Sequence, residues 1–567
     1  MNKKLKFSYA VTPLILSLSI ISPVYAQSVA SLSYNGRAMF EVSFFDKGEK
    51  SDFMEKESAF TLSDLQKSEI LNSLDYWNSI LGPYARNLQP VNIHVGTEFE
   101  QNAFASSAYY SGNSNNGAYS VEELIIRNGP YDPVKTNTSV ISVGKYLGSS
   151  VNENSPGGWY VNSYSPICEN ESSAEYVSTF IHEFGHALGI CCVSEIMEID
   201  HDVYDLFPNI KINGEGDAFA YDRVPSQDGT QDKYFIVSYF PEYETTGDHF
   251  REHLYDIYGN KARAGMPIIT QRIFDYISEH SEEPVDRNDF FIVDEMSRNA
   301  NQFPNQYGSA FFKGEHISEA LNGALIDGVD GVPINGWEGQ PELKQYFPSL
   351  EGDNYVIFSP ELSHLQTKGM MSHVSYTNYT TFIEVELALM QDLGYKIDRR
   401  NFFGFSEYGS DKNYVNTHGY FARNIDGTEY VAGKPNYTNL GVGFHIYGDH
   451  NSIVQNADLL AYGKGAVGIR VDGTENKITV NNGVNVRADG YKGTGILVSA
   501  GSKHNITVNG TVTATGENGN ALRFDYGSSS NGATDEYRGS YIDYHRYFVS
   551  DTDGSIAFYP DFSEANL

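Results

Sequence analysis

Residues 181–189 read Ile-His-Glu-Phe-Gly-His-Ala-Leu-Gly, and the interpretation of the whole chain starts from this stretch. His182 and His186 stand four residues apart, so on a helix they project from the same face. Two imidazoles placed in this way can bind one metal ion, and the pattern is typical of tetrahedral zinc. Glu183, beside the first histidine, could act as general base toward a water activated by the metal. We therefore predict a helix that carries a catalytic metal site.

The sequence around this motif predicts a layer of helices and short strands. Apolar residues at helical spacing predict a first helix over residues 61–81, ended by Gly82-Pro83. Residues 172–175 have the capping-box pattern Ser-x-x-Glu, so we expect the helix of the histidine motif to begin there and to end at Gly189. Residues 381–393 predict another helix, closed by Gly394. Strand-like runs between the first two helices favour an α+β fold.

A repeat marks the C-terminal part of the chain. Gly-Phe-His-Ile at 443–446 recurs as Gly-Ile-Arg-Val at 468–471, as Gly-Ile-Leu-Val at 495–498 and, more weakly, as Ala-Leu-Arg-Phe at 521–524. Further strand-like runs follow within these units of roughly 26 residues. Such a period predicts an all-β right-handed β-solenoid over residues 441–530, with an ordinary β-sandwich as the alternative.

The N-terminus and the composition are typical of an exported protein. Residues 1–26 combine a basic start, an apolar run and a Val-Tyr-Ala end, which predicts a secretory signal peptide cut after Ala26. The alternative, a membrane anchor, would need a longer apolar run. The 567 residues include 73 acidic and 39 basic ones, and the net charge of −34 argues against nucleic-acid binding. Hydrophobic residues make up 40% of the chain, which argues against disorder, and three cysteines are too few for a disulfide-stapled fold.

The third metal ligand is not settled by spacing alone. A catalytic zinc needs a third protein ligand and an open position. In the metzincin pattern a third histidine lies ten residues after the first, but here that position is Cys192. Cys192, His201 and His364 are all candidates, although a thiolate would leave the zinc a weaker Lewis acid.

Three blocks of sequence in a specific order resemble the leishmanolysin-like branch of the metzincin metalloproteases. The blocks are the histidine motif at 182–189, then Val-Pro-Ile-Asn-Gly-Trp at 332–337 after a long insertion, and then Ser363-His364 and Gly-Met-Met-Ser at 369–372. Residues 382–395 look like the C-terminal helix of that branch. The resemblance implies that His364 is the third ligand and that Met371 is the methionine beneath the zinc. His373, in the same turn, could contact a transition-state oxyanion.

These observations divide the chain into predicted domains. We expect a metzincin-like α+β catalytic domain over residues 27–400, with an insertion at about 190–360, and a linker over 401–440. The β-solenoid over 441–530 and a tail over 531–567 follow. A signal peptide, an enzyme domain and a Gly/Asn-rich solenoid together resemble an autotransporter passenger of a Gram-negative bacterium. This resemblance implies a place on the outer membrane, at the cell surface or outside the cell, through a C-terminal barrel. Residues 531–567 are too few for that barrel, so the chain is either part of a longer protein or a passenger that stands alone.

The expected function is that of a secreted or surface-exposed zinc endopeptidase. It would hold one catalytic Zn²⁺ and hydrolyse protein or peptide substrates through a zinc-activated water. The alternative is a non-catalytic adhesin with a degenerate or structural zinc site. Glu183 beside both histidines favours the enzyme, because a structural zinc site would prefer four protein ligands.

Overall fold

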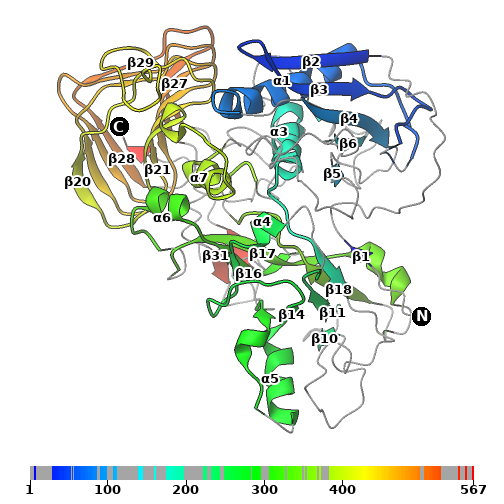
Figure 1. Ribbon diagram of the computed structural model, residues 1–567. Helices are drawn as coiled ribbons and strands as arrows, with labels where there is room; N and C mark the ends of the chain where they lie inside the picture. Colours follow the sequence, from blue (N-terminus) through cyan, green and yellow to red (C-terminus); the bar gives the residue numbers. More distant parts are fainter. Residues whose placement is uncertain are drawn as a thin grey trace.

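The computed structural model shows a mixed α/β protein with many strands, several parallel sheets and few helices (Figure 1). It describes residues 6–7, 28–52, 54, 56–85, 90–98, 106–110, 138–144, 159–160, 174–196, 221–225, 231–242, 248–281, 284–294, 306–325, 329–347, 350, 354–366, 369–371, 382–498, 503–524, 547–549, 556–558 and 565–566. Apart from Lys6–Phe7, the predicted signal peptide lies outside these residues. No helix in the described part is long and apolar enough to cross a membrane.

The first sheet lies in the N-terminal part of the chain. Its strand order is β2 (Ser28–Tyr34), β3 (Arg37–Phe44), β4 (Val91–Glu98), β6 (Thr138–Gly144) and β5 (Ser106–Tyr110). The three inner strands are parallel, and β2 and β5 run antiparallel to their neighbours at the two edges. Between β3 and β4 the chain forms α1 (Asp64–Leu81), as the sequence predicts. The side chain of Ser63 caps α1 by accepting from the Gln66 backbone N–H, which satisfies one of the free donors of the first turn.

The helix with the histidine motif, α3 (Tyr176–Ala187), packs against α1 (Figure 1). The Trp77 indole N–H of α1 donates to the Ile181 carbonyl at 2.8 Å, in the turn that carries the first histidine. The predicted start of this helix is wrong, because residues 174–175 form β8 (Ala174–Glu175) and pair with β7 (Trp159–Tyr160). Ala174 and Glu175 pair with a neighbouring strand, so their backbone groups do not form the first turn of the helix, as the capping box predicted. The helix ends at Ala187, and the chain turns at Gly189, whose φ of +111° favours glycine.

Between α3 and His364 the chain builds two further sheets. The larger has the order β10 (Tyr221–Val224), β11 (Asp232–Ile236), β18 (Tyr355–Pro360), β17 (Val332–Gly339), β16 (Gln306–Phe312) and β13 (Leu254–Tyr255). The smaller has the order β1 (Lys6–Phe7), β9 (Ser194–Ile196), β12 (Ser238–Tyr239), β14 (Pro267–Ile269) and β15 (Phe291–Ile292). The helices of this region are α4 (Asp248–Arg251), α5 (Gln271–His280) and α6 (Glu315–Leu321). Strand β18 ends at Pro360, so it leads the chain to His364.

Residues 403–524 form three parallel sheets, which we call the parallel-sheet unit. The first contains β19 (Phe403–Glu407), β21 (Val442–Ile446), β24 (Val467–Val471), β27 (Thr494–Val498) and β30 (Asn520–Phe524). The second contains β20 (Asn413–Asn416), β22 (Ser452–Gln455), β25 (Lys477–Val480) and β28 (His504–Val508), and β33 (Ala565–Asn566) adds to its end. The third contains β23 (Leu459–Leu460), β26 (Asn485–Arg487) and β29 (Thr511–Thr513). Each repeated strand of the sequence pairs with its counterpart in the next repeat, as in Val442 with Val467 and Val467 with Thr494.

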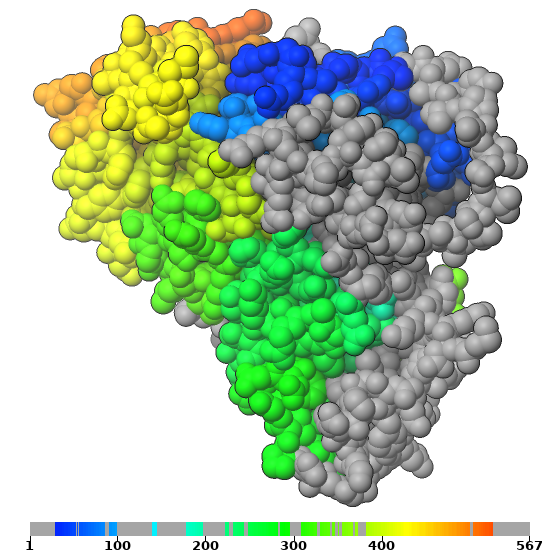
Figure 2. All heavy atoms as spheres, viewed as in Figure 1, coloured from blue at the N-terminus to red at the C-terminus, as the bar shows by residue number. Residues whose placement is uncertain are grey.

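The segment predicted as a linker, residues 401–440, belongs to this unit. It supplies β19 and β20, which are the first strands of two of the parallel sheets. Helix α7 (Glu384–Asp392) lies between this unit and α3 (Figure 1). The largest hydrophobic cluster runs from the first sheet through α1, α3 and α7 to Val442, Val467 and Leu497. In the space-filling view the yellow residues of the unit pack directly against the blue and green ones (Figure 2).

Candidate metal centre

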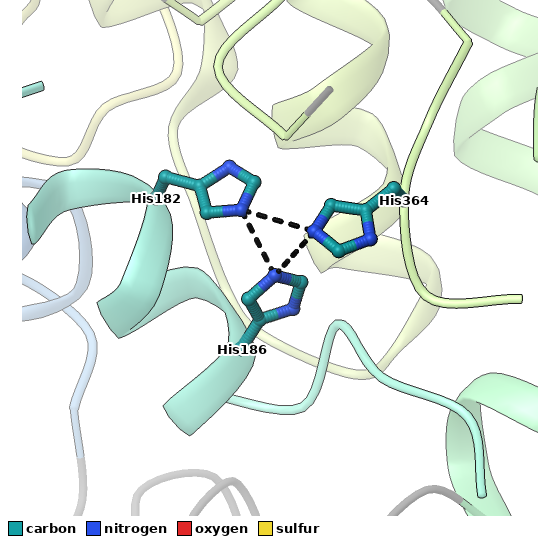
Figure 3. Close-up of side chains that lie close together, drawn as sticks. All are labelled: His182, His186 and His364. Carbon is teal, nitrogen blue, oxygen red and sulfur yellow. Dashed lines mark hydrogen bonds between the residues drawn. The ribbon is translucent and has the colours of Figure 1, made fainter. Parts of the chain in front are cut away.

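Three histidines from distant parts of the chain converge on one point (Figure 3). His182 and His186 come from α3, and His364 follows β18. Their Nε2 atoms lie 2.9 Å (His182 to His186), 3.1 Å (His186 to His364) and 3.2 Å (His182 to His364) apart. Tetrahedral zinc with Zn–N bonds of about 2.0–2.1 Å would place its nitrogens about 3.3 Å apart. The group could therefore hold one metal ion after a slight outward movement of the rings.

Each imidazole is oriented through its other nitrogen. Nδ1 of His182 lies 2.6 Å from the Met370 carbonyl oxygen, and Nδ1 of His186 lies 2.6 Å from the Ile190 carbonyl oxygen. A carbonyl only accepts, so both Nδ1 atoms donate and Nε2 is left with its lone pair toward the metal position. Burial lowers the pKa of His186, and it lowers the pKa of His364 well below its ordinary value. Neutral imidazole is the form that binds a metal.

His364 is oriented by a carboxylate instead of a carbonyl. Its Nδ1 lies 2.9 Å from Oε2 of Glu361, and both side chains are buried. The other oxygen of Glu361 accepts from the Ser363 backbone N–H at 3.1 Å. The Asn335 backbone N–H on β17 donates to the His364 carbonyl at 2.9 Å, so a neighbouring strand also fixes this segment. Glu361 was not predicted from the sequence, although its place three residues before His364 was a usable signal.

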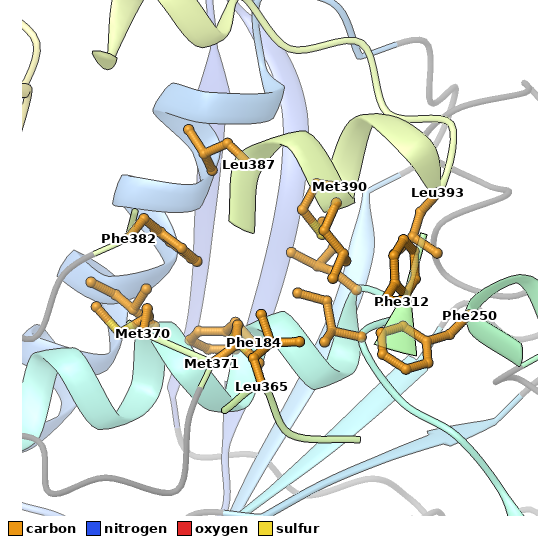
Figure 4. Packing of buried hydrophobic residues seen from close by; sticks show 14 of the residues in the cluster. Phe184, Phe250, Phe312, Leu365, Met370, Met371, Phe382, Leu387, Met390 and Leu393 are labelled. Atoms are coloured by element: carbon orange, nitrogen blue, oxygen red, sulfur yellow. The ribbon is translucent and has the colours of Figure 1, made fainter. Parts of the chain in front are cut away.

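The predicted methionine turn lies under α3. Met371 is fully buried, and a Cβ built on Gly185 of α3 would lie 2.4 Å from its sulfur (Figure 4). A glycine in the histidine motif therefore makes room for this side chain. The Leu365 backbone N–H donates to the Met371 carbonyl at 2.9 Å, which ties the turn to the residue after His364.

The side chain of Glu183 is buried. The side chain is 4% exposed, and burial raises its pKa well above the ordinary value. A carboxyl with a raised pKa accepts and returns a proton more readily near neutral pH than an exposed glutamate does. Its neighbour in the sequence, His182, belongs to the histidine group.

The remaining sequence candidates lie elsewhere or outside the described residues. Cys192 is absent from the metal-ligating group found among the described residues, and burial raises the pKa of its thiol well above the ordinary value. Its backbone N–H donates to Ser363 Oγ at 2.9 Å. Cys191 and Cys192 are free thiols, as expected. His201 and His373 lie outside the described residues.

Comparisons with protein-family models, with curated proteins and with solved structures found no match to this chain. The site is therefore interpreted from its own geometry. Three imidazoles that converge on one point, with a buried carboxyl next to the first of them in the sequence, could supply the ligands and the proton acceptor of metal-assisted hydrolysis.

Proposed function

We propose that the chain is a zinc-dependent endopeptidase of the leishmanolysin-like metzincin type. The observation that carries the proposal is the convergence of His182, His186 and His364 next to Glu183. Only three protein ligands gather among the described residues, which matches a catalytic site with an open position better than a closed structural site. This count also favours the enzyme over the alternative of an adhesin with a structural zinc.

The residues of the chain divide the chemistry of peptide hydrolysis between them. Zinc at this site would polarise the scissile carbonyl and lower the pKa of water. Glu183 takes one proton from the attacking water on its carboxylate as the oxygen adds to the carbonyl carbon. It then returns that proton to the amide nitrogen, so that the C–N bond breaks and a neutral amine leaves. His182 and His186 hold their positions throughout, because their Nδ1 atoms donate to the carbonyls of Met370 and Ile190, and His364 lies with Nδ1 2.9 Å from the Glu361 carboxylate.

A strand beside the site favours an extended peptide as substrate. Among the described strands, β5 is an edge of the first sheet, and it contacts α3. An extended peptide can add to such an edge by backbone hydrogen bonds, which places its carbonyl groups along the helix that carries the histidines.

We further propose that the parallel-sheet unit is a β-solenoid and that the chain is an exported passenger. Support for the solenoid comes from the strands between Val442 and Phe524, which pair with a strand 25 to 28 residues later in all three sheets, as in Val467 with Thr494 and Lys477 with Asn505. Export rests on the signal-peptide pattern of residues 1–26.

The test compares the chain from Gln27 to Leu567 with its Glu183→Ala and His186→Ala variants. We expect the unaltered chain to bind one zinc and to cleave casein. Glu183→Ala should keep the zinc and lose cleavage by about 10²–10⁴-fold, whereas His186→Ala should lose the zinc itself. Unchanged cleavage in Glu183→Ala would refute the role of the carboxylate. Zinc binding without cleavage of casein or of a mixed peptide library would favour the adhesin instead.

A further inference from the structure

A second buried carboxylate, distinct from Glu183, holds the turn that orients His182. Glu386 of α7 is fully buried and accepts three backbone hydrogen bonds, from Met371 at 2.8 Å, from Ile383 at 2.9 Å and from Met370 at 3.1 Å. The carbonyl of Met370 is the group that accepts from Nδ1 of His182. Two hydrogen bonds in series therefore join the Glu386 carboxylate to a metal-ligating ring.

The space around this carboxylate leaves little freedom. A Cβ built on Gly369 would lie 2.4–2.5 Å from the carboxylate atoms of Glu386. The turn thus approaches the carboxylate as closely as a glycine allows, and three backbone donors fix its two oxygens. Three hydrogen bonds from backbone donors on two neighbouring elements therefore hold the turn against α7.

Helix α7 is in turn held by the parallel-sheet unit. The hydroxyl of Tyr408, at the end of β19, accepts from the Val385 backbone N–H at 3.1 Å. The ring of Tyr408 lies 5.8 Å from that of Tyr447, just after β21. Met371, Phe184 and Tyr408 also share one hydrophobic cluster with Val467 of β24. The packing is therefore continuous from the repeats to the turn beneath the histidines, and Figure 4 shows the part of this cluster around Met370 and Met371.

We propose that Glu386 is a positioning residue for the metal site, through which α7 and the parallel-sheet unit fix the Met370–Met371 turn and thereby the ring of His182. The inference rests on the metal site of the proposed function. It makes the repeats a structural support of the metal centre in addition to any role as a stalk.

Glu384 offers a matched control on the same helix. It is also buried, but its carboxylate pairs with Arg399 at 2.8 Å and with Arg400 at 3.0 Å instead of with the turn. Glu386→Gln and Glu384→Gln thus make the same substitution on the same helix at nearly the same depth. Only the first places an amide N–H against the backbone donors of the turn.

The experiment measures zinc affinity of the chain from Gln27 to Leu567 by competition with a chelator, at a temperature where circular dichroism shows every variant folded. Cobalt(II) absorption reports the ligand geometry in parallel. We expect Glu386→Gln to weaken zinc binding about tenfold or more and to change the cobalt spectrum, as for other partners that orient metal ligands. Glu384→Gln should lower the unfolding temperature but keep the zinc affinity within about twofold and the cobalt spectrum unchanged.

Two results would overturn the inference while leaving the proposed metal site intact. One is a Glu386→Gln variant that binds zinc as the unaltered chain does, and the other is an equal loss of affinity in Glu384→Gln. If Glu386→Gln does not fold, Gly369→Ala takes its place, because its Cβ displaces the same carboxylate from the turn. An unaltered chain that binds no zinc would instead refute the metal site itself, and the inference with it.

Discussion

At the scale of single residues, the metal centre depends on what each imidazole does with its second nitrogen. The Nδ1 atoms of His186 and His182 donate to the backbone carbonyls of Ile190 and Met370, whereas Nδ1 of His364 lies 2.9 Å from the carboxylate of Glu361. The carboxylate makes His364 a stronger electron donor to a metal than its two companions. The three ligands are therefore chemically unequal although they are all histidines.

A histidine away from the metal centre gives the chain a dependence of stability on pH. His94 on β4 is half-buried, with Nδ1 2.9 Å from Ser51 Oγ and its ring beside Phe45, and burial lowers its pKa from 6.5 to about 4. Between pH 6.5 and 4 the unfolded chain binds a proton that the folded chain does not. The free energy of unfolding should therefore fall as the pH falls through this window, by up to about 3 kcal/mol from this residue.

His94→Gln should remove that part of the pH dependence. Urea unfolding at pH 7 and at pH 4.5 measures it, and the other histidines cancel because both chains contain them. The variant should lose about 2–3 kcal/mol less than the unaltered chain between the two pH values. Equal losses in both chains would show that His94 is protonated as easily in the folded protein as in the unfolded one.

At the scale of elements, the sequence predicted those parts whose signal is local or repeated. The repeated strands from β21 to β30 were predicted because each repeat has the same apolar pattern, whereas β19 and β20 lie in the segment predicted as a linker. Helix α1 was predicted because its cap and its stop are adjacent to it. The start of α3 was missed because it depends on the pairing of Ala174 with Trp159, and no local sequence pattern predicts that pairing. The spacing of His182 and His186 predicted two members of the histidine group, whereas His364 needed a family resemblance. Every residue has a backbone carbonyl, so the sequence could not predict that those of Ile190 and Met370 accept from the histidines.

Buried asparagines connect successive repeats and should carry a measurable part of the stability of the parallel-sheet unit. Asn476 is fully buried; its amide donates to the carbonyls of Gly448 at 2.8 Å and Asp472 at 3.0 Å, and its Oδ1 accepts from the Asn451 N–H at 2.9 Å. Asn476→Ala leaves three buried backbone groups without this partner, so we expect a loss of about 3 kcal/mol or more in chemical unfolding.

Asn481 provides the exposed counterpart. Its amide donates to Asn456 Oδ1 at 2.7 Å, again one repeat earlier, but in contact with solvent. Because water can replace that bond, Asn481→Ala should cost under about 1 kcal/mol. Similar losses for the two variants would mean that burial does not decide the strength of these bonds.

At the scale of the whole molecule, the boundary expected between catalytic domain and repeats is not a boundary of the core. The cluster that contains Met371 and Phe184 also contains Val442, Val467 and Leu497 of the parallel-sheet unit. Domains normally meet through smaller and more polar surfaces than they bury inside themselves. By contrast, the cluster under α5, with Ile273, Phe290 and Ile292, is separate from this core. The parallel-sheet unit also has a cluster of its own, which includes Phe444, Ile469 and Ile496. Val442, Val467 and Leu497 therefore attach the unit to the large core, while its interior forms a separate cluster.

Removal of the metal should test this attachment, because a ligand that binds only the folded state stabilises whatever unfolds together with its site. Zinc at about a thousand times its dissociation constant should stabilise the chain by about 4 kcal/mol. Hydrogen exchange of α3, β24 and β27 should then slow to a similar extent in all three elements when zinc replaces chelator. The reason is that Val467 of β24 and Leu497 of β27 lie in the same hydrophobic cluster as Phe184 of α3. Peptides from α5 should exchange at the same rate in both conditions, and His186→Ala should abolish every difference. Protection of α3 by zinc without protection of β24 and β27 would contradict the continuous core and restore the repeats as an independent domain.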